Sequence, residues 1–136
     1  GLLSEPTKTL KIAVVDDEKD LLSTYSLVVK TLGYKEPEVF SDGTSLIRSL
    51  MNDQKSFDVI LMDYRMPEMN GIEAARLIKR YRRQTQIVIM SGYDFVKEKA
   101  GAFGIPFLQK PFSIKQLGEC LENLKMDDLA SSQQIE

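Results

Sequence analysis

The sequence contains no histidine and a single cysteine, Cys120, among its 136 residues. Without histidine, the chain has no Ser/His/Asp or Cys/His nucleophile pair and no His-ligated metal, and it cannot carry phosphohistidine itself. One cysteine forms neither an internal disulfide nor a thiolate metal cluster. The chemistry of this protein is therefore left to carboxylates, hydroxyls, lysine and a hard cation.

A strong net charge and long apolar runs are also missing. The formal net charge is −2, which gives no electrostatic argument for binding nucleic acid or a membrane surface. Nothing resembles a signal peptide or a span of about 20 apolar residues, so we expect a cytoplasmic protein. The length suits one domain, and the hydrophobic fraction of 43% is ordinary for a globular chain.

Short apolar segments alternate with segments of helical periodicity, which predicts an α/β fold: a doubly wound parallel sheet of five strands with five helices. Strands are expected at residues 10–15, 38–40, 59–63, 86–90 and 105–109. Helices are expected at residues 19–32, 43–51, 71–82, 93–102 and from 113 onward, the fourth being short. Residues 1–9 are predicted to be flexible, 10–125 to form the domain and 126–136 to be a polar tail or linker stub.

Polar side chains stand just beyond four of the five predicted strands. Asp16 and Asp17 follow the first strand, and Asp63 ends the third. Ser91 follows the fourth and Lys110 the fifth. The carboxyl ends of parallel strands lie at one edge of a sheet, where ligands of open α/β folds bind, so these groups are expected to meet. Each residue type alone is common in turns, so the inference depends on the whole set.

These residue types fit one kind of chemistry. Three neighbouring carboxylates raise one another's pKa unless a cation compensates, and carboxylate oxygens are ligands that Mg²⁺ accepts. A carboxylate such as Asp63 can also be a nucleophile that accepts a phosphoryl group. Lys110, the metal and the hydroxyl of Ser91 would then hold the transferring oxygens.

At this point the chain resembles a known family, the CheY-like receiver domains of response regulators. The resemblance covers about residues 9–125. The segments that carry it are Val14–Glu18 (VVDDE), Leu61–Gly71 (LMDYRMPEMNG), Met90–Gly92 (MSG) and Leu108–Phe112 (LQKPF). The family implies a flavodoxin-like sheet with strand order 2-1-3-4-5.

The resemblance also implies a role for each matching residue of the site. Asp63 takes the place of the phosphoacceptor and Lys110 that of the family's lysine, with a cis bond before Pro111. Asp16 and Asp17 take the place of the acidic pair that binds Mg²⁺, with Asp17 as the direct ligand. Asp63 and the backbone carbonyl of Arg65 are expected to complete the protein ligands.

Two further positions correspond to the switch residues of the family. Ser91 stands at the switch hydroxyl and Phe107 at the switch aromatic. Phe107 lacks a hydroxyl, so its inward form is expected to be held by packing alone. The shortened segment between Ser91 and Lys110 leaves open whether the fourth-helix region still carries the output.

The resulting hypothesis is a phosphorylation switch in two-component or phosphorelay signalling. Its expected partners are a histidine kinase or histidine phosphotransfer protein and a downstream effector, with no direct nucleic acid and no membrane. It would catalyse only its own phosphorylation and dephosphorylation. One alternative is an aspartate-nucleophile phosphohydrolase, although such enzymes usually have a second acid where this chain has Arg65. Another is a degenerate receiver used only for docking.

Overall fold

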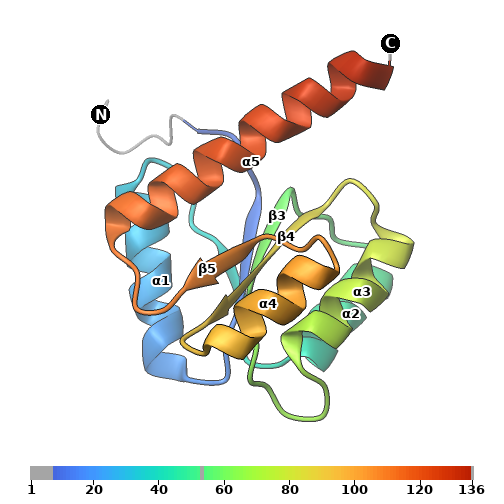
Figure 1. Ribbon diagram of the computed structural model, residues 1–136. Helices are drawn as coiled ribbons and strands as arrows, with labels where there is room; N and C mark the ends of the chain where they lie inside the picture. Colours follow the sequence, from blue (N-terminus) through green and yellow to red (C-terminus); the bar gives the residue numbers. More distant parts are fainter. Residues whose placement is uncertain (1–7, 53, 136) are drawn as a thin grey trace.

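The computed structural model describes residues 8–52 and 54–135, so most of the predicted flexible segment at 1–9 lies outside the described residues. Within these ranges, five parallel strands form one sheet of order β2-β1-β3-β4-β5, and helices alternate with the strands (Figure 1). This confirms the predicted doubly wound fold and the strand order that the resemblance implied. The elements are β1 (Ile12–Val15), α1 (Lys19–Thr31), β2 (Glu38–Phe40), α2 (Gly43–Met51), β3 (Val59–Asp63), α3 (Gly71–Tyr81), β4 (Gln86–Ser91), α4 (Asp94–Ala102), β5 (Phe107–Gln109) and α5 (Ile114–Ile135).

Helices cover both faces of the sheet, which therefore contributes to two cores (Figure 1). Successive strand side chains point to opposite faces, so alternate residues belong to different cores. The strand residues that face α1 and α5 are Ile12, Val14, Val59, Leu61, Val88, Met90 and Leu108. Those that face α2, α3 and α4 are Ala13, Val15, Ile60, Met62, Ile87 and Ile89. Burial on both faces explains why the strands are nearly continuous apolar runs in the sequence.

Short polar residues cap the starts of α2 and α3. The side chain of Asp42 accepts a hydrogen bond from the backbone N–H of Ser45 and so caps α2. Asn70 and Glu73 form a reciprocal capping box at the start of α3. This cap fixes the point at which the chain leaves the loop after β3.

The fifth strand is one of the two edge strands of the sheet. β5 pairs only with β4 and so lies at the edge of the sheet, where a proline such as Pro106 is tolerated next to a strand. α4, between these two strands, is a short helix of nine residues, which also agrees with the prediction.

The last helix is longer than the sequence predicted. α5 continues through Ile135, so residues 126–135, predicted as a polar tail or linker stub, extend the last helix. No glycine or proline follows Gly118, so nothing in the sequence stops the helix. Neither α5 nor any other helix in the described ranges is long and apolar enough to cross a membrane.

Candidate functional site

Three carboxylates meet at the carboxyl end of β1 and β3, which are neighbours in the sheet. Asp63 is the last residue of β3, and Asp16 follows β1, whose Val15 pairs with Met62. Carboxylate oxygens of Asp16, Asp17 and Asp63 all lie within 4.8 Å of one another. Asp16 and Asp63 are buried, whereas Asp17 is exposed. The cluster therefore has two buried members and one that faces solvent.

The alternation of side chains along the strands explains why these groups converge. Asp16 continues the row of Ile12 and Val14, and Asp63 continues the row of Val59 and Leu61. Both rows face α1 and α5. A one-residue shift in either strand would turn its aspartate to the opposite face, so the register of the sheet decides whether the cluster forms.

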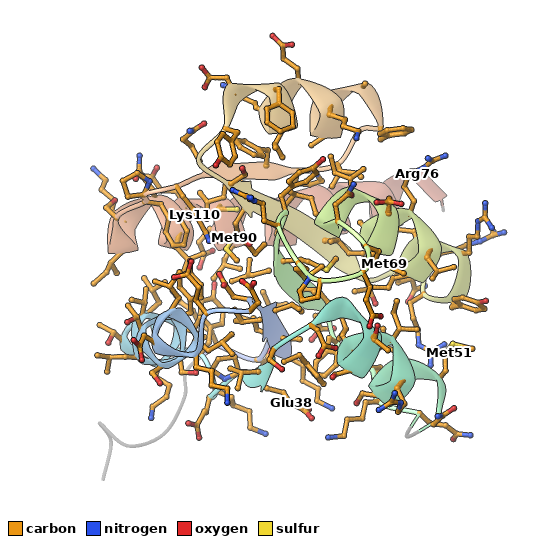
Figure 2. The ribbon with its side chains drawn as sticks, turned by 90° about the horizontal axis from the view of Figure 1, so that it is seen from below. Glu38, Met51, Met69, Arg76, Met90 and Lys110 are labelled. Atoms are coloured by element: carbon orange, nitrogen blue, oxygen red, sulfur yellow. The ribbon has the colours of Figure 1, made fainter. Side chains whose placement is uncertain are left out.

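Lys110 reaches into this cluster from the loop between β5 and α5. Its Nζ donates hydrogen bonds to Asp63 Oδ1 at 2.6 Å and to Asp16 Oδ2 at 3.1 Å. The backbone N–H of Lys110 donates to the carbonyl of Ser91 at 2.8 Å, which ties the end of β5 to β4. The peptide bond before Pro111 is cis, as the resemblance implied. Figure 2 shows Lys110 and Met90 in the view from below; the partner of Met90 in the register of the sheet is Leu108, two residues before Lys110.

The electrostatics of the cluster favour a further cation. Burial raises the pKa of Asp63 above its ordinary value; Lys110 opposes this rise, while Asp16 and Asp17 add to it. Burial disfavours the charge of Lys110, but its bonds to Asp63 and Asp16 raise its pKa above the ordinary value. Lys110 is therefore a cation at neutral pH, and it balances only part of the negative charge of the cluster.

The donor set fits Mg²⁺, because the clustered ligand atoms are carboxylate oxygens and their charge exceeds that of one ammonium. Arg65, whose carbonyl was predicted as a further ligand, lies two residues beyond Asp63 in the loop before α3. Its side chain is directed away to Tyr93, where Nη1 donates to the phenol oxygen at 2.9 Å. This bond joins the loops that follow β3 and β4.

Ser91 and Phe107, the two predicted switch residues, lie at the end of β4 and the start of β5. Ser91 ends β4 and is buried, and its Oγ accepts a hydrogen bond from the backbone N–H of Tyr93 at 3.1 Å. Among the described residues, no hydrogen bond joins Ser91 to the aspartates. Phe107 begins β5, is half-buried and packs against the core under α4.

Sequence reasoning missed one residue of the site. Tyr25 falls on the apolar face of α1, and this position in the sequence indicates only a core residue. In the structure the centre of its ring lies 5.8 Å from Lys110 Nζ. Helical periodicity predicts that such a tyrosine is buried, but it does not predict which residue of another element the phenol approaches.

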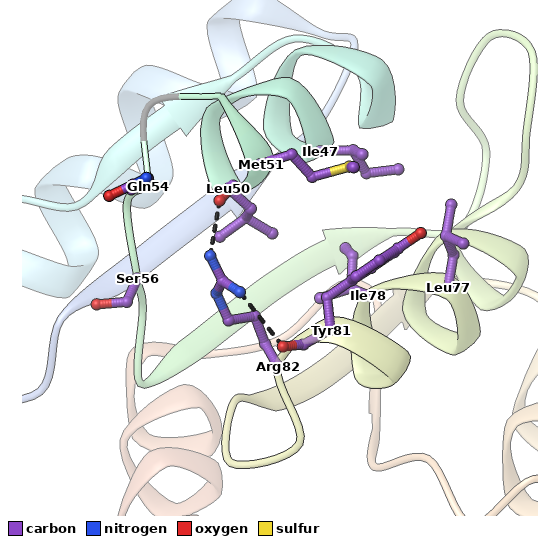
Figure 3. Close-up of a pocket in the computed structure, with 9 residues that line it drawn as sticks. All are labelled: Ile47, Leu50, Met51, Gln54, Ser56, Leu77, Ile78, Tyr81 and Arg82. Atoms are coloured by element: carbon purple, nitrogen blue, oxygen red, sulfur yellow. Dashed lines mark hydrogen bonds between the residues drawn. The ribbon is translucent and has the colours of Figure 1, made fainter.

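Hollows border the helices, and one of them adjoins the acidic cluster. A groove of about 610 Å³ runs between α1 and the β5–α5 loop and has Tyr25, Lys110 and Phe112 in its wall. Another hollow, of about 560 Å³, lies between the ends of α2 and α3 (Figure 3). There Arg82 Nη2 donates to the carbonyl of Leu50 at 2.7 Å. This second hollow is near the start of β3, at the end of the sheet opposite Asp63.

The five-stranded parallel sheet of order 2-1-3-4-5, with helices alternating along the chain, is a flavodoxin-like fold of the receiver type. Residues 12–122 match the family described as "Response regulator receiver domain". The chain belongs to the response regulator receiver domains, which act in two-component signalling.

Curated relatives agree with this membership. The chain is 28% identical over 122 residues to the response regulator protein TodT of Pseudomonas putida, and 31% identical over 124 residues to the nisin biosynthesis regulatory protein NisR of Lactococcus lactis. These matches cover 86% and 87% of this chain, but 52% of each relative. The chain thus spans about half the length of these two relatives.

Solved structures show the same fold. A response regulator receiver domain protein from Clostridium thermocellum superposes with a TM-score of 0.78 at 26% identity, covering 89% of this chain and 98% of that one. The chemotaxis protein CheY4 of Vibrio cholerae gives a TM-score of 0.74, also at 26% identity, covering 86% and 99%.

Proposed function

We propose that this domain is a phosphorylation switch in which Asp63 accepts the phosphoryl group in a Mg²⁺-dependent reaction. The observation that carries the proposal is the position of Lys110, whose Nζ bonds to both Asp63 and Asp16 within the cluster of three carboxylates. An ammonium group this close to Asp63 could stabilise the negative oxygens of a phosphoryl group on that residue, which supports the proposal.

In this reaction, a carboxylate oxygen of Asp63 attacks the phosphorus of the donor. The P–N bond of a phosphohistidine, or the P–O bond of a small phosphodonor, breaks as the acyl phosphate forms, and the donor takes the electron pair. A Mg²⁺ ion held by Asp16, Asp17, Asp63 and the carbonyl of Arg65 would neutralise the charge of the transferring oxygens. Later attack by water on the phosphorus releases inorganic phosphate and restores Asp63.

The partner that donates the phosphoryl group is proposed to be a histidine kinase or a histidine phosphotransfer protein, because this chain has no histidine of its own. Its contact surface is proposed to be the groove between α1 and the β5–α5 loop. The walls of this groove are mainly apolar, and Lys110 stands at its border. A donor seated there would bring its phosphohistidine to the carboxyl edge of the sheet.

The output is proposed to follow from the new charge on Asp63. The Oγ of Ser91 accepts a hydrogen bond from the backbone N–H of Tyr93. The hydroxyl proton of Ser91 is therefore still available to donate to a phosphoryl oxygen. Movement of Ser91 would leave space for Phe107, which is only half-buried. The surface formed by α4, β5 and α5 would then change its affinity for a downstream effector.

Mass spectrometry after incubation with acetyl phosphate and Mg²⁺ tests the phosphoacceptor. The parent should gain one phosphoryl group, and the Asp63→Asn variant should gain none. Repeated turnover of a generic phosphoester would instead favour an aspartate-nucleophile phosphohydrolase. An unlabelled parent would favour a degenerate receiver that acts only by docking.

A further inference from the structure

Lys110 has a neighbour besides the two aspartates. Tyr25 extends from α1 toward the ammonium group, and its ring centre lies 5.8 Å from Lys110 Nζ. Tyr25 is 7% exposed, so this contact lies in a region that excludes most water. A cation beside an aromatic ring and a phenol dipole is attracted to both, and the attraction is stronger where water is excluded.

The same tyrosine also supports the loop that carries Lys110. Its ring stacks on Phe112, with ring centres 5.7 Å apart and an angle of 18° between the planes. Phe112 is two residues beyond Lys110, on the far side of the cis peptide bond before Pro111. Tyr25 therefore touches the lysine head group and, through Phe112, the backbone segment that positions it.

Tyr25 and Lys110 also interact through their charges. Burial raises the pKa of the Tyr25 phenol, and the charge of Lys110 is the main influence that opposes this rise. The phenol and the ammonium are thus electrostatically coupled as well as close. A leucine or phenylalanine at the same helical position would fill the core but would lack the hydroxyl dipole.

From these contacts we propose that Tyr25 is a positioning residue for Lys110: its ring and hydroxyl keep the ammonium directed at Asp63 for phosphoryl transfer. The inference rests on the proposed function of Asp63 as phosphoacceptor. Two bonds to carboxylates do not define the path of a long lysine side chain, whereas a third contact from α1 restricts it. Because Tyr25 also lines the groove proposed for the donor, a docked donor would press on the residue that holds the lysine.

The test compares Tyr25→Phe, which keeps the ring and removes the hydroxyl, with Tyr25→Leu, which removes both. The rate of Asp63 labelling by acetyl phosphate and Mg²⁺ is followed by mass spectrometry, with circular dichroism to show that each variant is folded. Tyr25→Phe should slow labelling by about threefold to tenfold, as loss of one polar contact in the transition state would. Tyr25→Leu should slow it further.

Tyr34→Phe is the matched control. Tyr34 is another buried phenol in the same core, and its hydroxyl has no hydrogen-bond partner among the described residues. This variant should be labelled at the parent rate. Equal rates in the parent and a fully folded Tyr25→Phe would overturn the inference and leave the proposed function standing.

A second measurement does not require labelling. In urea unfolding, the shift in midpoint caused by Tyr25→Phe should shrink in a Lys110→Met background, while the shift caused by Tyr34→Phe should be the same in both. Equal Tyr25→Phe shifts in the two backgrounds would show that the residues are not coupled and would overturn the inference. If the parent is not labelled but Tyr25 and Lys110 are clearly coupled, the proposed function is wrong and the contact between the two residues stands.

Discussion

Gly71 lies directly against the backbone of Asp63. A Cβ at position 71 would come within 2.6 Å of the carbonyl oxygen of Asp63 and 3.1 Å of the Cα of Tyr64. The backbone N–H of Gly71 also donates to the carbonyl of Tyr64 at 2.8 Å. The chain can therefore leave β3, turn and enter α3 only because position 71 has no side chain.

Gly71→Ala should destabilise the protein by about 1–3 kcal/mol, because an obstructing backbone cannot yield as a side chain can. It should also slow labelling of Asp63 by displacing the end of β3. Gly101→Ala is the control, since a Cβ there meets nothing within 4 Å and the residue lies in α4. That variant should be more stable by about 0.5–1 kcal/mol. Urea denaturation measures both, and equal stabilities for the two variants would contradict the close approach at Gly71.

Magnesium should stabilise the domain by binding to the acidic cluster. At about 100 times its dissociation constant, a ligand that binds only the folded state adds about 2.7 kcal/mol to the free energy of unfolding. The thermal midpoint should rise with MgCl₂ but not with NaCl of the same ionic strength. Asp17→Asn should remove most of this rise, whereas Asp20→Asn, an exposed acid on α1 outside the cluster, should retain it. A rise that persists in Asp17→Asn would contradict the proposed ligand set.

The raised pKa of Asp63 predicts how stability depends on pH. A carboxyl whose pKa is higher in the folded state than in the unfolded state stabilises the fold below the ordinary value of 3.8, and this contribution is lost as pH rises through the folded-state pKa. In magnesium-free buffer, Asp63→Asn should therefore be more stable than the parent at pH 7. The difference should disappear as pH falls toward 3.8, the ordinary value.

The pKa of Asp42 is shifted in the opposite direction to that of Asp63, so the two residues predict opposite effects of pH on stability. Its pKa is lowered by hydrogen bonds from Ser45 at the start of α2, so its stabilising contribution is present above the ordinary value and is lost in acid. Asp42→Ala should be less stable than the parent at pH 7 and approach it in acid. Thermal unfolding between pH 3 and pH 7, roughly the range over which carboxyls titrate, measures both variants. The same sign of change at pH 7 for both would contradict the electrostatics of the Asp63 cluster.

Arg65 stands at the rim of the site, where its bond to Tyr93 joins two of the loops around Asp63. Arg65→Ala should alter access of water to the acyl phosphate and shorten its half-life. The measurement is the decay of the phosphorylated form by mass spectrometry after removal of the phosphodonor. Arg76→Ala, which loses only a contact with the ring of Phe103, is the control and should decay at the parent rate. An unchanged half-life in Arg65→Ala would exclude this role.

Most of the fold was predictable from local patterns. The buried runs of β1, β3 and β4 and the helical spacing between them predicted the alternation of strands and helices, which the structure confirms. The ends of elements were less predictable, because they depend on where pairing and packing stop. The length of α5 is an example: polarity after Leu124 predicted an end that the helix does not have.

The sequence by itself determined the identity of the acidic and lysine groups and the edge of the sheet at which they meet, because strand ends in a parallel sheet share one edge. Only the tertiary structure decided which side chains touch. Lys110 and Asp16 are separated by 94 positions in the chain, and their contact depends on the register of the sheet and on the path of the β5–α5 loop. The approach of Tyr25 to Lys110 and of Gly71 to Asp63 was likewise decided only by the tertiary structure. Such contacts arise from packing between distant elements, which no local periodicity encodes.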